Sequence, residues 1–312
     1  MGRIEDDRKG TEMEISQFFI KGDMKGAIAY MREHEEFRDV LPAYTAIFEE
    51  REYRTFEVPE RLNEILRWYQ VYFRDTFYLG LPEAEAADKL RAGLGALLGM
   101  PGVEEALLTE RLRALFEAEG YHALFGKTQG YYGPYIWRET VPTVYQVQLP
   151  DGTAEYTVNL LKGFVFRGWM DYLTFGRYGT GGWASPDGTI NCVERSYDLE
   201  SERFQVSLLK HEAQHTADMK RFPGITPAEL EYRAKLVELH YASDLGLLRK
   251  FLSEAEESRA GDSHAAASVR IRRDFADTDP GSLSRVQARA LELLRAHTKE
   301  MEEKYGGQAP ND

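Results

Sequence analysis

The chain has 312 residues, of which 43% are hydrophobic and 29% are charged, a composition that can bury one large core or two smaller ones. Its net charge of −13 argues against a general nucleic-acid-binding protein and against a protein held on anionic membranes. The sequence also lacks an apolar run long enough to span a bilayer. We therefore expect neither a nucleic-acid partner nor a membrane partner.

Cys192 is the single cysteine, so the chain cannot form an internal disulfide, and we expect it to be a buried strand residue. Residues 1–8 are rich in charge and lack the apolar segment of a signal peptide. Both features predict a cytoplasmic protein, although a leader removed earlier would leave no trace in this sequence. The composition does not predict the oligomeric state.

Residues 1–125 are predicted to form a helical N-terminal region. Apolar residues recur at helical spacing around Ile15 to Phe19 and again from Leu62 to Tyr69, and prolines separate the segments. Pro82 followed by two glutamates at positions 83 and 85 is typical of a helix start. The aromatic residues between Trp68 and Tyr78 are predicted to be helix core.

The composition changes near residue 126 to one rich in Gly, Tyr, Thr and Val. Residues 144–149 and 154–158 alternate apolar and polar side chains on either side of Pro150-Asp151-Gly152-Thr153, which predicts a β-hairpin. The turn sequence Ser185-Pro186-Asp187-Gly188 followed by residues 189–193 predicts a second hairpin. We expect a small antiparallel sheet here.

Helical periodicity returns near Glu202 and should end before Pro223-Gly224. Thr226-Pro227-Ala228-Glu229 has the pattern of a capping box, so a further helix is expected from Pro227 to about Arg249. Residues 255–268 are predicted to contain a loop or mobile link at Gly261-Asp262-Ser263. A last helix is expected over residues 283–304, followed by a disordered tail at 306–310.

The most informative stretch is His211-Glu212-Ala213-Gln214-His215, which has the pattern H-E-x-x-H. On a helix, residues i and i+4 project from the same face, so both imidazoles can reach one metal ion. Neutral histidines suit Zn²⁺, and the glutamate between them can act on a metal-bound water. The motif predicts a zinc cofactor.

A catalytic zinc site needs a third protein ligand. In one class it is the last histidine of H-E-x-x-H-x-x-G-x-x-H, but those positions hold Asp218 and Arg221 here, which excludes that class. In the other main class a glutamate on a following helix supplies it. Glu231, one turn into the capped helix, is our first candidate, with the small Ala234 allowing close helix packing. Glu238, seven residues later on the same face, is the alternative.

On His211, Glu212, His215 and Glu231 with Ala234, the chain resembles the gluzincin zinc metallopeptidases, over roughly residues 200–245. The resemblance implies a zincin-like core with a β-sheet before the motif helix, whose edge strand pairs with a peptide substrate. The fold class is therefore expected to be α+β, mainly helical. The expected ranges are a helical region at 1–125, a catalytic core at 126–250, and a helical segment with its tail at 251–312.

The resemblance also implies roles. Glu212 is the catalytic base that moves a proton from the zinc-bound water to the leaving amine, and His211, His215 and Glu231 bind zinc. Asp218 could accept a hydrogen bond from the second imidazole nitrogen of His215.

The transition-state oxyanion needs a further donor, for which His240, Tyr241 and Tyr178 are candidates without a supporting pattern. The remaining histidines show no partner at metal spacing and are expected to be surface or core residues; they are His34, His122, His264 and His297.

These residues predict a zinc-dependent metallopeptidase acting on a peptide or protein. Three alternatives stay open. The motif could occur by accident on an exposed helix, the protein could bind zinc in a scaffolding role, or it could hydrolyse a non-peptide amide with the same groups. The identity of the substrate cannot be inferred from the sequence.

Overall fold

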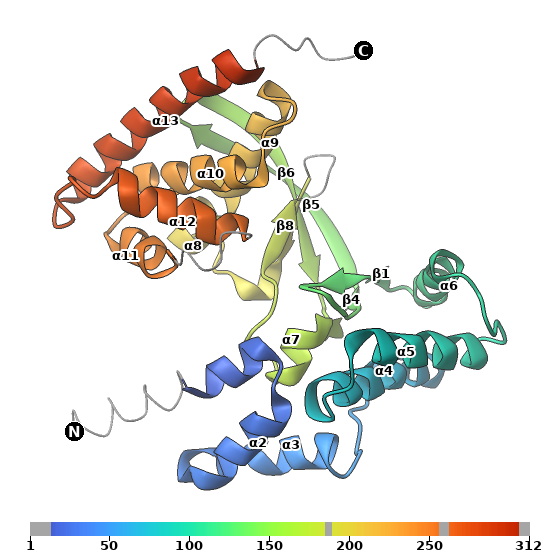
Figure 1. The fold of residues 1–312 in the computed structure, drawn as a ribbon. Helices are drawn as coiled ribbons and strands as arrows, with labels where there is room; N and C mark the ends of the chain where they lie inside the picture. Colours follow the sequence, from blue (N-terminus) through green and yellow to red (C-terminus); the bar gives the residue numbers. More distant parts are fainter. Residues whose placement is uncertain (1–13, 185–188, 256–261, 306–312) are drawn as a thin grey trace. The chain divides into compact units, whose positions relative to one another are not determined.

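The computed structural model describes residues 14–184, 189–255 and 262–305 (Figure 1). The chain separates into two compact units. Unit 1 comprises residues 1–140 and 162–180, and unit 2 comprises residues 141–161 and 181–312. The division departs from the three ranges expected from the sequence. Residues 126–140 group with the N-terminal helices, and the C-terminal helices group with the H-E-x-x-H helix.

Unit 1 is mainly helical, as predicted for the N-terminal region. Residues 14–21 are helical, and the chain continues through α2 (Met24–Glu33), η1 (Glu35–Phe37), α3 (Leu41–Phe48), α4 (Glu60–Phe73), the π-helical η2 (Arg74–Tyr78), α5 (Glu83–Leu97) and α6 (Glu105–Ala118). Pro82 is the N-cap of α5, close to the helix start that its sequence predicts.

The core of unit 1 is aromatic. Tyr69, Tyr72, Phe73 and Phe77 are at most 4% exposed, which confirms the prediction that these residues are helix core. Their rings contact one another and the rings of α7 (Gly168–Leu173), for example Phe77 against Trp169 at 5.0 Å between centroids. Such large side chains remove much apolar surface from water and so contribute to the stability of this unit.

Short strands complete unit 1. The strands β1 (His122–Leu124), β4 (Tyr135–Trp137) and β7 (Phe166–Arg167) form an antiparallel sheet in the order β1-β4-β7. The strands β2 (Lys127–Thr128) and β3 (Tyr131–Tyr132) pair separately.

Unit 2 is built on a four-stranded sheet in the order β5-β6-β9-β8. β5 (Glu139–Leu149) and β6 (Gly152–Lys162) are neighbours joined by Pro150 and Asp151, which confirms the first predicted hairpin. β8 (Gly182–Ala184) pairs antiparallel with β9 (Ile190–Val193), as expected for the second, whose turn at 185–188 lies outside the described residues.

One pairing in this sheet differs from the expected antiparallel arrangement, because β6 and β9 run parallel. Alternation and turn patterns report hairpins between neighbouring segments and carry no information on how two hairpins join. Cys192 lies fully buried in β9, as predicted.

The helices of unit 2 begin with α8 (Glu202–Phe204), the π-helical η4 (Gln205–Lys210) and α9 (His211–Arg221), which follow one another without a break. After these come α10 (Pro227–Tyr241), α11 (Gly246–Ser253), α12 (Ser263–Asp274) and α13 (Leu283–Tyr305). Together with the sheet they enclose a second apolar core that includes Phe204, Leu236, Phe251 and Ile271.

Two predicted boundaries in this region are wrong. The helix expected to reach Arg249 ends at Tyr241, because Ala242 is extended and the Asp244 carboxylate accepts a hydrogen bond from the backbone N–H of Gly246, starting a new helix. Ser263, expected in a loop or mobile link, begins α12, because Asp262 caps that helix by accepting from His264 and Ala265 N–H groups.

Other predicted boundaries hold. α9 ends before Pro223, and α13 covers the last predicted helix. The expected tail at 306–310 lies outside the described residues. Among the residues that the structure describes, no helix has both the length and the apolar character needed to cross a membrane.

Candidate metal centre

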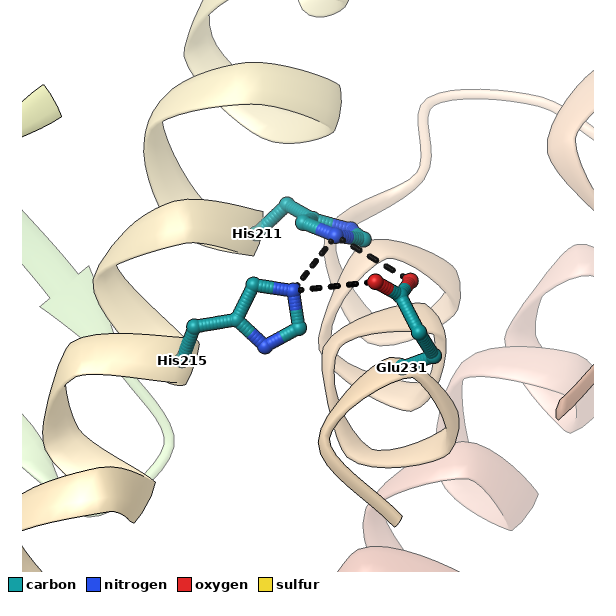
Figure 2. A group of neighbouring side chains, drawn as sticks. All are labelled: His211, His215 and Glu231. Carbon is teal, nitrogen blue, oxygen red and sulfur yellow. Dashed lines mark hydrogen bonds and ion pairs between the residues drawn. The ribbon is translucent and has the colours of Figure 1, made fainter. Parts of the chain in front are cut away.

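The two motif histidines lie on α9 and point to one side of it (Figure 2). Their Nε2 atoms are 2.9 Å apart, and each residue is 9% exposed. On the opposite side of the helix Ala213 is fully buried in the core of unit 2. The i, i+4 spacing therefore places both imidazoles on the same face of α9, as predicted, while the opposite face packs in the core.

A π-helical segment, η4, directly precedes His211. Such insertions are frequently found at functional sites, because the extra residue rotates the side chains that follow relative to those that come before. The sequence offers no simple signal for it.

Glu231 faces the histidines from α10 (Figure 2). Its Oε1 lies 3.5 Å from Nε2 of His215, and its Oε2 lies 3.5 Å from Nε2 of His211. The three residues each offer one ligand atom, and these atoms all lie within 4.8 Å of one another. The structure thus brings together the three residues that we expected to bind zinc.

The capping box at Thr226 fixes where α10 begins and therefore where Glu231 lies along the helix. The Thr226 hydroxyl accepts from the backbone N–H of Glu229, and the Glu229 carboxylate accepts from the backbone N–H of Thr226, which confirms the predicted capping box. Ala234 is fully buried on α10, and α10 packs against α9. A larger side chain at such a position would have to displace its neighbours.

Glu238, the alternative third ligand, has a different place. Its Oε1 lies 2.7 Å from Nδ1 of His211, on the side of the ring away from Glu231, and the carboxylate is almost fully buried. A carboxylate that accepts from Nδ1–H fixes the ring and its tautomer and directs the Nε2 lone pair toward the metal position. Of the two glutamates, Glu231 is placed to coordinate and Glu238 to orient.

Charges in the cluster are strongly coupled. Burial lowers the pKa of His211, but contacts with the Glu231 and Glu238 carboxylates outweigh burial and raise that pKa to about 10. Burial raises the pKa of Glu231, but His211, His215 and His264 hold it far below its usual range. The cluster therefore favours a positive charge between these groups. A divalent cation can take the place of that proton, in which case metal binding releases it.

Asp218 does not have the role that we predicted. It lies 2.8 Å from Nε of the fully buried Arg233, while Nδ1 of His215 has no hydrogen-bond partner among the described residues. The Arg233 guanidinium is a stronger partner for a buried carboxylate than a neutral imidazole. Arg233 also donates to the Thr298 hydroxyl on α13 at 3.1 Å, so the pair joins α9, α10 and α13.

Three predicted oxyanion donors are not brought to the cluster by any described contact. Nδ1 of His240 lies 3.3 Å from the backbone oxygen of Gln287. The ring of Tyr241 contacts Lys210, whose Nζ lies 4.3 Å from the ring centroid. Tyr178 belongs to unit 1 and is 46% exposed. His240 and Tyr241 thus contact a backbone oxygen and a lysine side chain, respectively.

Glu212 is half-buried on α9, next to His211. Burial, and to a smaller extent the Glu212 charge, raise the pKa of Tyr197. Glu212 therefore keeps some exposure to solvent on the helix that carries both histidines.

The sequence missed one residue of the cluster. His264, which we expected to be a surface or core residue, is mostly exposed and places its Nδ1 2.9 Å from Oε2 of Glu231. His264 stands in the first turn of α12, far from the motif along the chain, so only the packing of α12 against α10 could have revealed it.

The donor set fits a metal. Two imidazole nitrogens and one carboxylate are the protein ligands of many catalytic zinc sites, which keep a fourth position open. The same three donors also suit non-haem Fe(II), so they do not identify the metal on their own. The glutamate between the two histidines is the feature that favours hydrolytic zinc chemistry.

Comparisons with other proteins identify no relative: no protein-family model matches this chain, and neither a curated protein nor a solved structure shows a significant match to it.

Proposed function

We propose that this chain is a zinc-dependent hydrolase of the gluzincin type and that it cleaves peptide bonds. The observation that carries the proposal is the convergence of His211, His215 and Glu231, with donor atoms within 4.8 Å of one another, beside the carboxylate-bearing Glu212. An accidental H-E-x-x-H on an exposed helix would not require a glutamate from a second helix, 12% exposed, to face both imidazoles.

In this proposal His211 and His215 bind the metal through Nε2, and Glu231 binds it through its carboxylate. Zn²⁺, when bound, would polarise the scissile carbonyl and lower the pKa of a water molecule. Glu212 accepts a proton from the attacking water, whose oxygen forms the new C–O bond. As the C–N bond breaks, Glu212 returns the proton to the amine nitrogen.

The sheet of unit 2 supports a peptide over another amide. β8 is an edge strand, paired only with β9 in the described sheet. A Cβ placed on Gly182 of β8 would lie 2.9 Å from the Leu208 side chain, so this strand packs closely against the helical segment that leads into His211. An extended peptide can add to such an edge through backbone hydrogen bonds.

The proposal is tested by cleavage of a peptide library with the zinc-reconstituted protein and with Glu212→Gln. We expect the wild type to cleave and Glu212→Gln to lose at least ~10²-fold in kcat while it keeps its zinc, because the substitution removes the base and no ligand. Activity that survives in Glu212→Gln would show that the base is assigned wrongly. Zinc binding without cleavage of any peptide would favour the scaffolding alternative.

A further inference from the structure

His264 contacts Glu231 but has no role in the proposed reaction. Its Nδ1 lies 2.9 Å from Oε2 of Glu231, while its side chain is 64% exposed. The Glu231 side chain, in contrast, is only 12% exposed. Its Oε2 is a buried acceptor without an aligned hydrogen-bond donor among the described residues. A buried carboxylate oxygen in this state gains from any donor that aligns with it.

The position of His264 is fixed by its helix and by contacts of that helix with α10. Asp262 caps α12 by accepting from the backbone N–H of His264 at 2.9 Å. Farther along α12, Asp274 accepts a hydrogen bond of 2.7 Å from the Tyr232 hydroxyl, the residue next to Glu231 on α10. The guanidinium of Arg270 also stacks on the Tyr232 ring, 3.9 Å from its centroid. The imidazole therefore reaches Glu231 from an anchored helix.

The geometry favours a role beside the metal rather than on it. The described group of ligand atoms within 4.8 Å of one another contains His211, His215 and Glu231, and His264 is not part of it. His264 lies closest to Oε2 of Glu231, at 2.9 Å, an oxygen that is also 3.5 Å from Nε2 of His211, whereas Oε1 lies 3.5 Å from Nε2 of His215. A donor on one carboxylate oxygen restricts rotation of the group and leaves the other oxygen to coordinate.

We propose that His264 is a positioning residue for Glu231: its Nδ1–H donates to Oε2 and so presents Oε1 to the metal. This inference rests on the proposed function, which assumes a metal ion bound by His211, His215 and Glu231. It adds a residue from α12 to a site whose other parts lie on α9 and α10.

The test is the affinity for Zn²⁺ alone, measured by competition with a fluorescent chelator, for the wild type, His264→Ala and His264→Asn. We expect His264→Ala to weaken zinc binding about 10-fold, the lower end for loss of a residue that orients a metal ligand. His264→Asn should stay within about threefold of the wild type, because its amide nitrogen can donate from nearly the same place as Nδ1.

Ser263→Ala, one residue earlier on α12, is the matched control and should bind zinc as the wild type does. Thermal unfolding of the metal-free variants should match the wild type, because the His264 side chain is mostly exposed. Equal affinity of His264→Ala and wild type would overturn the inference. Equal losses in His264→Ala and His264→Asn would also overturn it, since the ring itself would then be a ligand. Failure of the wild type to bind zinc would instead overturn the proposed function.

Discussion

The two units bury different kinds of polar group. In unit 1 the buried polar side chains mostly serve the backbone, as in Asn63, which bonds the main chain of Phe56 and Val58, and Arg74, which donates to the Phe48 carbonyl. In unit 2 most of them are ionisable groups on three neighbouring helices, namely His211, His215, Asp218, Arg233, Lys235, Glu238 and His297.

The two kinds of buried polar group have opposite effects on the free energy of folding. A side-chain amide that bonds the backbone satisfies both partners and stabilises its unit. Burying several ionisable groups together costs free energy that apolar residues would not, and such clusters concentrate where chemistry is done. In the part of the chain that the structure describes, the metal-capable group lies in unit 2. Substitutions in both units, together with zinc binding, test this contrast.

The buried pair Asp218–Arg233 should be the most sensitive point of unit 2. Asp218→Ala leaves the Arg233 charge without its partner and should lower the free energy of unfolding by about 3–5 kcal/mol, measured by urea denaturation. The Asp218–Arg233 pair joins α9 to α10, the two helices that carry the three expected zinc ligands. We therefore expect the affinity for zinc to fall as well.

The matched control is the exposed pair Arg289–Glu292, in which Glu292 is 68% exposed. Glu292→Ala should change the free energy of unfolding by less than about 1 kcal/mol, since water screens such pairs. Similar effects of the two substitutions would remove the distinction between buried and exposed charge that the comparison relies on.

Zinc should stabilise the protein through unit 2. At a free zinc concentration 100 times Kd, binding to the folded state alone adds about 2.7 kcal/mol to the free energy of unfolding. His215→Ala should abolish this gain, because it removes one of three ligands. The measurement is thermal unfolding with and without added zinc, and an undiminished shift in His215→Ala would place the metal elsewhere.

His297 should make unit 2 less stable in acid. Its burial, and then the charges of Arg270 and Arg233, lower its pKa to about 4. The folded state therefore favours the neutral ring, so the stabilisation is complete above about pH 6.5 and is lost as the pH falls toward about 4. After allowance for solvent screening the effect is on the order of 1–2 kcal/mol.

The check is the free energy of unfolding of the metal-free protein between pH 4 and pH 7, for the wild type and His297→Gln. The variant should show a shallower dependence on pH in this range. Parallel curves would mean that His297 takes up its proton equally in both states.

Tyr172→Phe probes unit 1 and should have the smallest effect. The Tyr172 hydroxyl donates to Oε1 of Gln70 at 2.7 Å, and its loss should cost about 1 kcal/mol in urea denaturation. Zinc affinity should be unchanged. A weaker zinc affinity in this variant would contradict the assignment of metal chemistry to unit 2 alone.

Local sequence signals predicted the parts of the site that depend on local geometry. The spacing of His211 and His215 defines one helix face, and the capping box at Thr226 sets the start of α10, so Glu231 could be proposed from both together. The choice between Glu231 and Glu238 depended on how α9 and α10 pack, which no local pattern encodes.

The contacts of His264 and Asp218 also depend on how helices pack against one another. His264 reaches Glu231 only because α12 packs on α10, and Asp218 bonds Arg233 rather than His215 because α10 offers a buried guanidinium. The end of α10 at Tyr241 was missed for a local reason, since Asp244 starts a new helix in a segment whose apolar periodicity continues. The parallel pairing of β6 and β9 likewise arises between segments far apart in the sequence.

The central claim is that His211, His215 and Glu231 hold one metal ion in unit 2. Equilibrium dialysis against Zn²⁺ tests it most directly, with metal content measured for the wild type, Glu231→Ala and Glu238→Ala. We predict one zinc ion per wild-type chain, the largest loss of affinity in Glu231→Ala, and a smaller loss in Glu238→Ala, which orients a ligand without being one. A wild type that binds no zinc, or a Glu231→Ala variant that binds it with undiminished affinity, would contradict the account.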